Sequence, residues 1–379
     1  MSMYILRTAE SATEGQSDKI ADQISDAVVD AVLQKDTKGS VACETLISNG
    51  FCIVAGEMTT DSYVPIVEIA KNTIREIGYT DSAYGFDYRS AGVITAVNER
   101  TSDLSEGMTI NGKIGASDSS SVVGFACDET PEMIPFETSL ARSLAEKLAE
   151  VRKSGLLPFL LPDGKTQVTV RFEDDIPVAI ERIVVSVQHM RQTPLGQLRE
   201  AVIEEVIKNT APKEMLADCE MAVNPAGTFV IGGPQCDTGL TGRKNIDDCY
   251  SSRVPHGGGA LSGKDPMRID RLGAYLARYL AKNIVATGAA RSAKVRLVYQ
   301  IGTPEPIVVT IRTALSSGID DHALAARIAK EIDLTSGTTA ERLNLLKAQY
   351  RKIAVYGHFG RSGFGWEKTD LVSEIKRFV

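Results

Sequence analysis

The same order of elements occurs three times in this chain of 379 residues: a helix, two strands joined by a short turn, and a second helix. Apolar residues at helical spacing predict the helices, and short apolar runs on either side of turn residues predict the strands. The three units comprise Ser17–Gln34, Val41–Ile47, Phe51–Gly56 and Ser62–Ile77; then Thr138–Lys153, Gln167–Phe172, Pro177–Val187 and Pro194–Lys208; then Asp270–Val285, Ala293–Tyr299, Pro306–Thr313 and Asp321–Ile332. This recurrence predicts an α+β fold with three similar subdomains around a pseudo-threefold axis.

Composition places the chain among ordinary globular proteins, with 43% apolar and 24% charged residues. A net charge of −7 argues against a nucleic-acid-binding surface. The sequence has no apolar segment of membrane-spanning length and its start does not resemble a secretory signal, so no membrane partner and a cytoplasmic location are expected. The six cysteines are scattered without metal-ligand spacing, and we interpret them as free thiols.

Irregular segments rich in glycine and serine separate the three units. One of them, residues 98–121, is long enough to be a lid or a linker. The segments suggest an N-terminal subdomain of residues 1–125, a central subdomain of residues 126–230 and a C-terminal subdomain of residues 231–379, with the chain interleaved between them. Near the C-terminus, the glycine-rich segment around Trp366 is expected to be a loop that packs on the body of the protein.

The segment Gly232–Asp270 combines two glycine clusters with basic and acidic residues. Glycine lets the backbone approach a ligand closely, and lysine and arginine supply positive charge for phosphate oxygens. Close to the glycine clusters are Arg243, Lys244, Lys264 and Arg268, with Asp237, Asp265 and Asp270 among them. Because carboxylates repel a polyphosphate unless a divalent cation lies between, the combination indicates a site for Mg²⁺-bound polyphosphate. The spacing is not that of a Walker A loop, and the alternative is two ordinary surface loops.

Long motifs run along nearly the whole chain. They are SDKIADQISDAV at 17–28, VACET at 41–45, GEMTT at 56–60, LPDGKTQVTV at 161–170, NPAGTFVIGGPQCDTGLTGRK at 224–244, HGGGALSGKDP at 256–266, YGHFG at 356–360 and WEKTD at 366–370. In these motifs the chain resembles the S-adenosylmethionine synthase (methionine adenosyltransferase) family. The resemblance implies βαβ-type subdomains and a homodimer, sometimes paired into a homotetramer, whose active sites are built from both chains.

The same resemblance implies a reaction and its cofactors. The sulfur of L-methionine displaces tripolyphosphate from C5′ of ATP, and the tripolyphosphate is then hydrolysed to phosphate and diphosphate. Two Mg²⁺ ions and one K⁺ ion are implied for each site. A neutral thioether attacks carbon while a highly charged group leaves, so positioning and charge stabilisation are the main tasks of the protein.

The resemblance also implies roles for individual residues. The catalytic set is Lys165, Gln16, Arg243 and Lys264; the ATP-binding set is Asp163, Phe229, Asp237, Lys244 and Arg268; the amino-acid set is Glu57, Arg100 and Asp118; and the metal ligands are Asp18 and Asp270 for Mg²⁺ and Glu44 for K⁺. Without the resemblance, a lone acid such as Glu44 is usually a solvated residue. Asp18, in the first turn of a helix, is also what the helix dipole favours.

Departures from the family's motifs lie at the site. The family's Gly-His-Pro-Asp-Lys reads Gly-Gln-Ser-Asp-Lys here, so Gln16 supplies an uncharged hydrogen-bond donor. The family's Gly-Ala-Gly-Asp-Gln-Gly reads Gly-Ala-Ser-Asp-Ser-Ser at 115–120, which keeps Asp118. Arg100 aligns with a glutamine that helps to hold methionine, and its guanidinium suits a carboxylate. Arg268 aligns with a lysine and keeps the charge with a different geometry.

Three functions are compatible with these departures. The first is a divergent methionine adenosyltransferase, which the retained Glu57 and Asp118 and the length of the match favour. The second is a paralogue that adenosylates another nucleophile or only cleaves ATP, and the clustering of changes on the amino-acid side is what it predicts. The third is a non-catalytic regulatory partner of an active family member. Retention of Lys165, Arg243 and Lys264 argues against the third, because such a partner does not need them.

Overall fold

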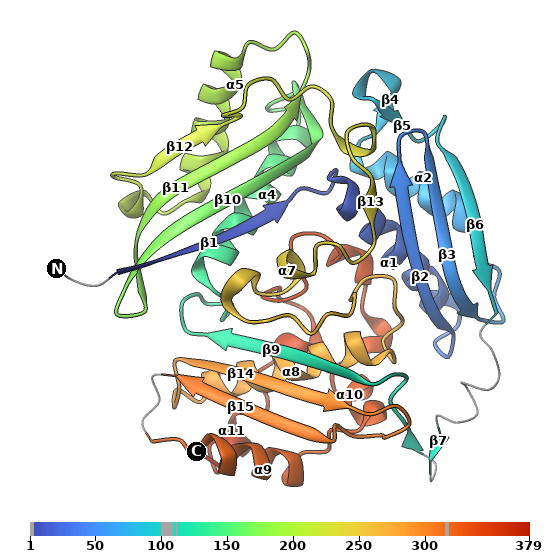
Figure 1. Ribbon diagram of the computed structural model, residues 1–379, viewed down its shortest axis with the longest axis vertical. Coiled ribbons are helices and arrows are strands. Elements are labelled where there is room, and N and C mark those ends of the chain that lie inside the picture. The colour runs from blue at the N-terminus through green and yellow to red at the C-terminus, as the bar shows by residue number, and fades with distance from the viewer. Residues whose placement is uncertain (1–3, 100–108, 111–112, 315–317) are drawn as a thin grey trace.

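Three open sheets surround a central region of irregular chain, and each sheet has helices packed against one face (Figure 1). The computed structural model describes residues 4–99, 109–110, 113–314 and 318–379. Each unit has the predicted order. The elements are α1 (Ser17–Lys35), β2 (Ser40–Ser48), β3 (Phe51–Thr59) and α2 (Ile66–Ile77); α4 (Phe136–Lys153), β10 (Leu160–Glu173), β11 (Ile176–His189) and α5 (Leu195–Val202); and α8 (Ile269–Ala286), β14 (Ser292–Tyr299), β15 (Val308–Ala314) and α9 (Asp321–Glu331). The prediction of an α+β fold with three similar subdomains is confirmed.

Strands from distant parts of the chain complete the three sheets. Their orders are β13 (Gly239–Leu240)–β2–β3–β6 (Gly92–Asn98); β1 (Tyr4–Ala12)–β10–β11–β12 (Glu220–Val223); and β15–β14–β9 (Ser120–Cys127). The short pairs β4 (Thr80–Asp81) with β5 (Phe86–Asp87) and β7 (Thr109–Ile110) with β8 (Lys113–Ile114) lie outside these sheets. The segment between β12 and α8, which contains β13 and α7 (Asn245–Asp248), runs through the centre between the sheets (Figure 1). The segment Gly232–Asp270, which was predicted to bind polyphosphate, therefore lies where the three units meet.

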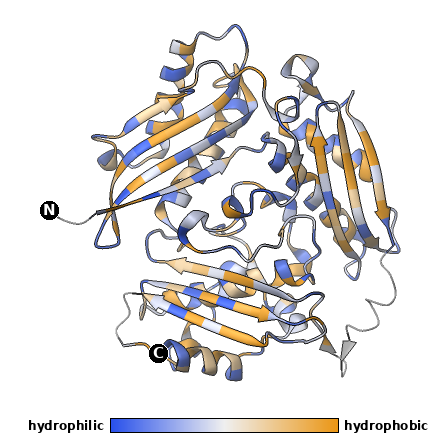
Figure 2. Cartoon of the chain, in the orientation of Figure 1, coloured by the Kyte–Doolittle hydropathy of each residue, from blue (hydrophilic) through white to orange (hydrophobic). Residues whose placement is uncertain are grey.

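The strands alternate between a buried and a more exposed face, as expected for sheets covered on one side. On β10, Val168, Val170 and Phe172 are buried, whereas Lys165 is half exposed. Figure 2 shows hydrophobic and hydrophilic residues following one another along this and other strands. The pleat thus turns the core residues of β10 toward the helices and leaves the side chain of Lys165 available to a ligand.

Several element boundaries differ from the prediction, most of all those of β10 and of the helix over 194–208. Strand β10 begins at Leu160 rather than at Gln167, because a register shift between Leu160 and Gly164 accommodates an irregular Pro-Asp-Gly segment within the strand. Glycine and proline in that segment hide the strand from a reading based on propensity. The helix predicted over 194–208 is α5 followed by a π-helical turn, Ile203–Ile207, and α6 (Lys208–Thr210).

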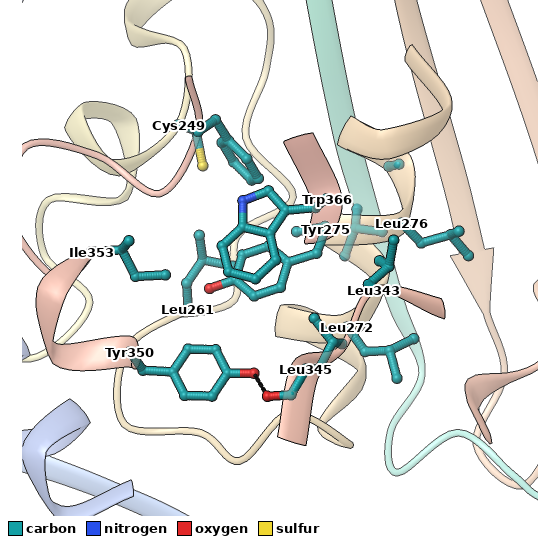
Figure 3. Close-up of a cluster of buried hydrophobic side chains, with 14 of the residues drawn as sticks. Cys249, Leu261, Leu272, Tyr275, Leu276, Leu343, Leu345, Tyr350, Ile353 and Trp366 are labelled. Atoms are coloured by element: carbon teal, nitrogen blue, oxygen red, sulfur yellow. Dashed lines mark hydrogen bonds between the residues drawn. The ribbon is translucent and has the colours of Figure 1, made fainter. Parts of the chain in front are cut away.

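Helix α8 forms the centre of the third unit. It is apolar around most of its circumference, and a helix of that kind must be buried. Tyr275 of α8 stacks on Trp366, with ring centroids 4.0 Å apart (Figure 3). Below them, the Tyr350 hydroxyl donates to the Leu345 carbonyl at 2.7 Å (Figure 3). The short helices α10 (Ser336–Arg342) and α11 (Val372–Ile375) complete this region. The expectation that the Trp366 loop packs on the body is confirmed.

Buried ion pairs fix α1 against its neighbours. The Lys19 ammonium donates to Asp22 at 2.8 Å and to Asp248 of α7 at 2.5 Å, and all three side chains are buried. One turn along, Arg271 of α8 donates to Asp26 at 2.5 Å. A buried charge without its partner is strongly destabilising, so these pairs hold α1 in place against α7 and α8. The start of α1 carries Asp18.

Two further expectations concern the cysteines and membranes. All six cysteines are free thiols, as predicted, and Cys43, Cys52, Cys127 and Cys249 are buried. No helix in the described part of the chain combines the length and apolar character needed to cross a bilayer.

Candidate active site

The first turn of α1 holds a carboxylate beside two basic residues. Gln16 caps the helix: its side-chain oxygen accepts from Lys19 N, and its amide nitrogen donates to Asp18 Oδ2, both at 3.2 Å. Asp18 also accepts from Leu240 N at 3.0 Å and is paired with Lys244, while Arg243 lies 3.8 Å away. Burial raises the pKa of Asp18, but the hydrogen bonds from Lys244 and Leu240 outweigh it, so the pKa lies below its ordinary value. Asp18 is therefore ionised at neutral pH.

Close backbone contact explains a glycine of the central motif. Strand β13 passes the start of α1 so closely that a Cβ on Gly239 would lie 2.1 Å from the Ser17 carbonyl oxygen. Only glycine permits this approach. Because β13 supplies Leu240 N to Asp18, the glycine is needed to hold the carboxylate in place.

Three predicted phosphate-binding cations line one cavity. Lys165, Arg243 and Lys244 are part of the wall of a cavity of about 770 Å³, together with Glu10 and His256. Lys165 donates to Glu10 of β1 at 2.9 Å. Burial raises the pKa of Glu10, but hydrogen bonds from Lys165 and Gln167 together have the larger effect. The pKa therefore lies below its ordinary value, and Glu10 is ionised at neutral pH. The cavity is large enough for a ligand of small-molecule size and presents cations from β10 and from the central segment.

The residues predicted for adenosine lie near the start of β10 and the end of β11. Asp163 Oδ2 accepts from Gly233 N at 2.7 Å, and burial raises the pKa of Asp163 to about 6. Asp237 is exposed in the turn that follows Gly233. Phe229 is partly exposed, and its backbone N–H donates to His189 Nε2 at 3.1 Å. The structure thus brings Asp163 and the Gly232–Asp237 turn together, with Phe229 on the segment leading into it.

A second group of predicted residues gathers where α8 begins. Lys264 is paired with Asp270, and the Ser120 hydroxyl donates to Asp270 Oδ1 at 2.6 Å. Arg268 donates to Glu57 of β3 at 2.5 Å and lies 3.4 Å from Asp265. A backbone bridge joins Lys264 to Ala42 of β2, two residues before Glu44. This group of residues is therefore positioned by β2, β3, β9 and the start of α8.

Each of these cations is paired with an acid. Lys165 pairs with Glu10, Lys244 with Asp18, Lys264 with Asp270 and Arg268 with Glu57. Because each positive charge is matched by a negative one, these four pairs together carry almost no net charge. When a metal-bound polyphosphate enters, the cations can turn to phosphate oxygens and the carboxylates to the metal, so charge on both sides stays compensated.

Comparison with known proteins identifies the fold and the motifs. Sequence models described as the S-adenosylmethionine synthetase N-terminal, central and C-terminal domains match residues 4–102, 113–229 and 231–368. The chain belongs to the S-adenosylmethionine synthetase family. S-adenosylmethionine synthases of Helicobacter hepaticus and Wolinella succinogenes are 51% and 50% identical to it over 382 residues, covering 100% of this chain and 99% of each relative. That of a Sulfurovum species is 50% identical over 384 residues and covers all of both chains.

The S-adenosylmethionine synthetase family uses metal ions, and the donors of this chain suit them. Within residues 4–99, 109–110, 113–314 and 318–379, no three His, Cys, Asp or Glu side chains gather as a ready-made metal cage. Mg²⁺ is commonly held by one or two carboxylates together with substrate phosphates, so single carboxylates such as Asp18 and Asp270 fit an ion that arrives with a phosphate-bearing substrate. Glu44 lines a smaller cavity of about 260 Å³ with Ser262 and Lys264. Its oxygens suit a hard cation.

The remaining predicted residues fall into two groups. Asp118 is exposed in the segment before β9, where Ser119 N donates to its Oδ1 at 2.7 Å. Arg100 lies outside the described residues, as does much of the candidate lid 98–121. Both Glu10 and His256 line the cavity without having been predicted as site residues. For His256 the sequence contains a signal, because this residue opens the motif at 256–266. The residue type alone does not indicate which way its side chain faces.

Proposed function

We propose that this chain forms S-adenosylmethionine from ATP and L-methionine. The observation that carries the proposal is that about half of the residues, over the whole chain, are identical to those of S-adenosylmethionine synthases. The cation-lined cavity and the ionised carboxylates beside it support it, because adenosyl transfer from ATP needs both. Hydrolysis of the released tripolyphosphate to phosphate and diphosphate is part of the same proposal.

The proposed reaction is an in-line displacement at carbon. The sulfur lone pair of methionine forms the S–C5′ bond, and the electron pair of the C5′–O bond leaves with tripolyphosphate. Lys165, Arg243, Lys244 and Lys264 bind the phosphates and stabilise the charge that builds on the leaving oxygens. Bound Mg²⁺ supplies further neutralisation of phosphate charge. Water then cleaves the tripolyphosphate while these cations still hold it.

Substrate and metal assignments follow the same proposal. Glu57 and Asp118 are assigned to the methionine amino group and Arg100 to its carboxylate. Asp163, Asp237 and Phe229 hold adenosine, with Asp237 on the ribose and Phe229 against the base; Arg268 and Gln16 complete the phosphate side. Two Mg²⁺ are assigned to Asp18 and Asp270 and one K⁺ to Glu44. Arg268 is paired with Glu57, so the phosphate side and the amino-acid side of the proposed site are in direct contact.

The proposed assembly is a homodimer with shared sites, which can pair into a tetramer. Exposed apolar residues on the sheets support it: Leu6, Phe51, Ile94 and Val308. The proposed compartment is the cytoplasm, whose reducing conditions suit six free cysteines. The subdomain boundaries 1–125, 126–230 and 231–379 remain part of the proposal.

The test is to incubate the purified protein with ATP, Mg²⁺ and K⁺, with and without methionine, and to identify the products by mass spectrometry. S-adenosylmethionine that forms only with methionine supports the proposal. An adenosylated product that forms only with another amino acid or thioether would assign a different nucleophile. No consumption of ATP under any of these conditions would favour a regulatory partner.

Lys165→Met is the informative variant for the same assay. Loss of the cation that faces the cavity should lower the rate of S-adenosylmethionine formation about a thousandfold, by analogy with removal of one transition-state donor. Lys208→Met, at an exposed lysine of α6, is the control and should retain full activity. Full activity in Lys165→Met would refute the assigned site.

A further inference from the structure

His256 presents a defined hydrogen-bond donor at the phosphate cavity. Its side chain is part of the wall that also contains Lys165, Arg243 and Lys244. Its Nδ1 accepts a hydrogen bond from Gly258 N at 2.8 Å. A ring nitrogen that accepts a hydrogen bond carries no proton, so the ring is neutral and its single proton is on Nε2. The loop thereby fixes both the tautomer and the orientation of the ring.

The other histidines of the chain are engaged or remote. His189 is buried, and its Nε2 accepts from Phe229 N. His358 is buried, and its Nδ1 contacts the Tyr275 hydroxyl at 2.8 Å. His322 is exposed on α9. Of the four histidines, His256 alone is part of the cavity wall.

Gln16 is partly engaged at the start of α1. Its oxygen caps α1 and one of its two amide N–H groups donates to Asp18, so a single N–H is left for phosphate. The cavity already contains three cations, and a neutral directional donor adds to them without charge repulsion between neighbours. A fixed donor aimed at a developing oxyanion is among the most effective ways to stabilise a transition state.

We propose that His256 Nε2–H donates a hydrogen bond to the leaving tripolyphosphate and is a catalytic residue of this chain. The proposal rests on the proposed function for the identity of the ligand. When the C5′–O bond breaks, its electron pair stays on the tripolyphosphate oxygen. His256 donates a hydrogen bond to the polyphosphate and keeps its proton, so no acid or base is consumed.

Two substitutions separate the donor from the loop. In His256→Asn, the side-chain oxygen can still accept from Gly258 N, but no nitrogen reaches the position of Nε2. In His256→Gln, the longer amide can place a donor near that position. His322→Asn is the matched control on the exposed surface. Binding of inorganic tripolyphosphate with Mg²⁺ is measured by calorimetry, adenosyl transfer by product analysis, and folding by melting temperature.

We expect His256→Asn to bind tripolyphosphate about tenfold more weakly, as expected for one hydrogen bond to a charged group. Its kcat should fall by about a hundredfold with little change in KM for methionine. His256→Gln should recover most of both losses, and His322→Asn should match the unsubstituted protein. A merely structural role would instead lower the melting temperature of both His256 variants and would not distinguish Gln from Asn.

Three results would overturn the proposal: unchanged tripolyphosphate binding in His256→Asn, equal losses in the Asn and Gln variants, or no tripolyphosphate binding by the unsubstituted protein. The proposed function can fail separately. If the protein forms no S-adenosylmethionine but binds tripolyphosphate with the expected difference between the Asn and Gln variants, the donor role stands and the reaction must be reassigned.

Discussion

Asp163, which is proposed to bind adenosine, makes the stability of the protein depend on pH. Burial raises the pKa of its carboxyl from 3.8 to about 6, although it accepts a hydrogen bond from Gly233 N. The folded protein therefore binds this proton more tightly than the unfolded chain does. Stability from this group is present below about pH 4 and is lost as the pH rises to about 6.

Asp163→Asn tests that coupling. The amide oxygen can still accept from Gly233 N, but the side chain cannot ionise. Between pH 4 and pH 6, the free energy of unfolding of the unsubstituted protein should fall relative to the variant by on the order of 2 kcal/mol. Urea unfolding of both proteins at matched concentration measures the difference, and other titrating groups cancel. A gap that stays constant over this range would show that Asp163 is solvated in the folded state.

At the level of residues, the sequence identifies which side chains carry charge but not which ones meet. Lys165 and Asp18 were predicted from their motifs, whereas the Lys165–Glu10 pair depends on the pairing of β1 with β10. That pairing joins segments more than a hundred and fifty residues apart, and no local pattern specifies its register. His256 shows the same difficulty, because its tautomer is set by a loop that only the structure describes.

At the level of elements, close packing of β9 on α8 depends on a glycine. A Cβ on Gly124 would lie 2.0 Å from the Ala277 carbonyl carbon and 2.2 Å from Arg278 N. Because both neighbours are backbone atoms, the strand and the helix would have to separate. Gly124→Ala should therefore cost about 2 kcal/mol or more of stability.

Gly124→Ala should also weaken ligand binding at the proposed site. Strand β9 carries Ser120, which donates to Asp270 near the start of α8, so separating the two elements should also weaken binding of Mg²⁺ with ATP. Gly196→Ala is the control: this glycine lies in the first turn of α5 with open space around it, and alanine favours helix. Melting temperature and nucleotide calorimetry check both variants. Equal melting temperatures would show that the β9–α8 contact is looser than the structure indicates.

Element type was largely predictable and element pairing was not. Regular apolar spacing in α1 and α8 and the Ser-Asn-Gly turn between β2 and β3 determine those elements locally. The entry of β1 and β9 into sheets with β10 and β14 depends on contacts across the whole chain. Short β13 has too few residues to show a strand pattern and is held by its neighbours, Ser17 and Leu46 among them.

For the whole molecule, the proposed site has two parts, and each part combines residues from two of the three units. One part includes Lys165 on β10 and Asp18 at the start of α1; the other includes Lys264 and Asp270 at the start of α8. In an isologous dimer, one part of a protomer faces the other part of its partner. Exposed apolar residues on the sheets, such as Phe51 and Ile94, are suited to an interface of that kind.

Complementation between two inactive variants decides whether the sites are shared. Lys165→Met and Asp270→Asn should each have little activity alone. If each site takes one part from each protomer, a mixed dimer has one intact site and one doubly substituted site. Random pairing in a co-expressed sample should then restore about a quarter of the unsubstituted activity. If both parts belong to one protomer, every site in the mixture carries a substitution and no activity returns, which would place the complete site within a single chain.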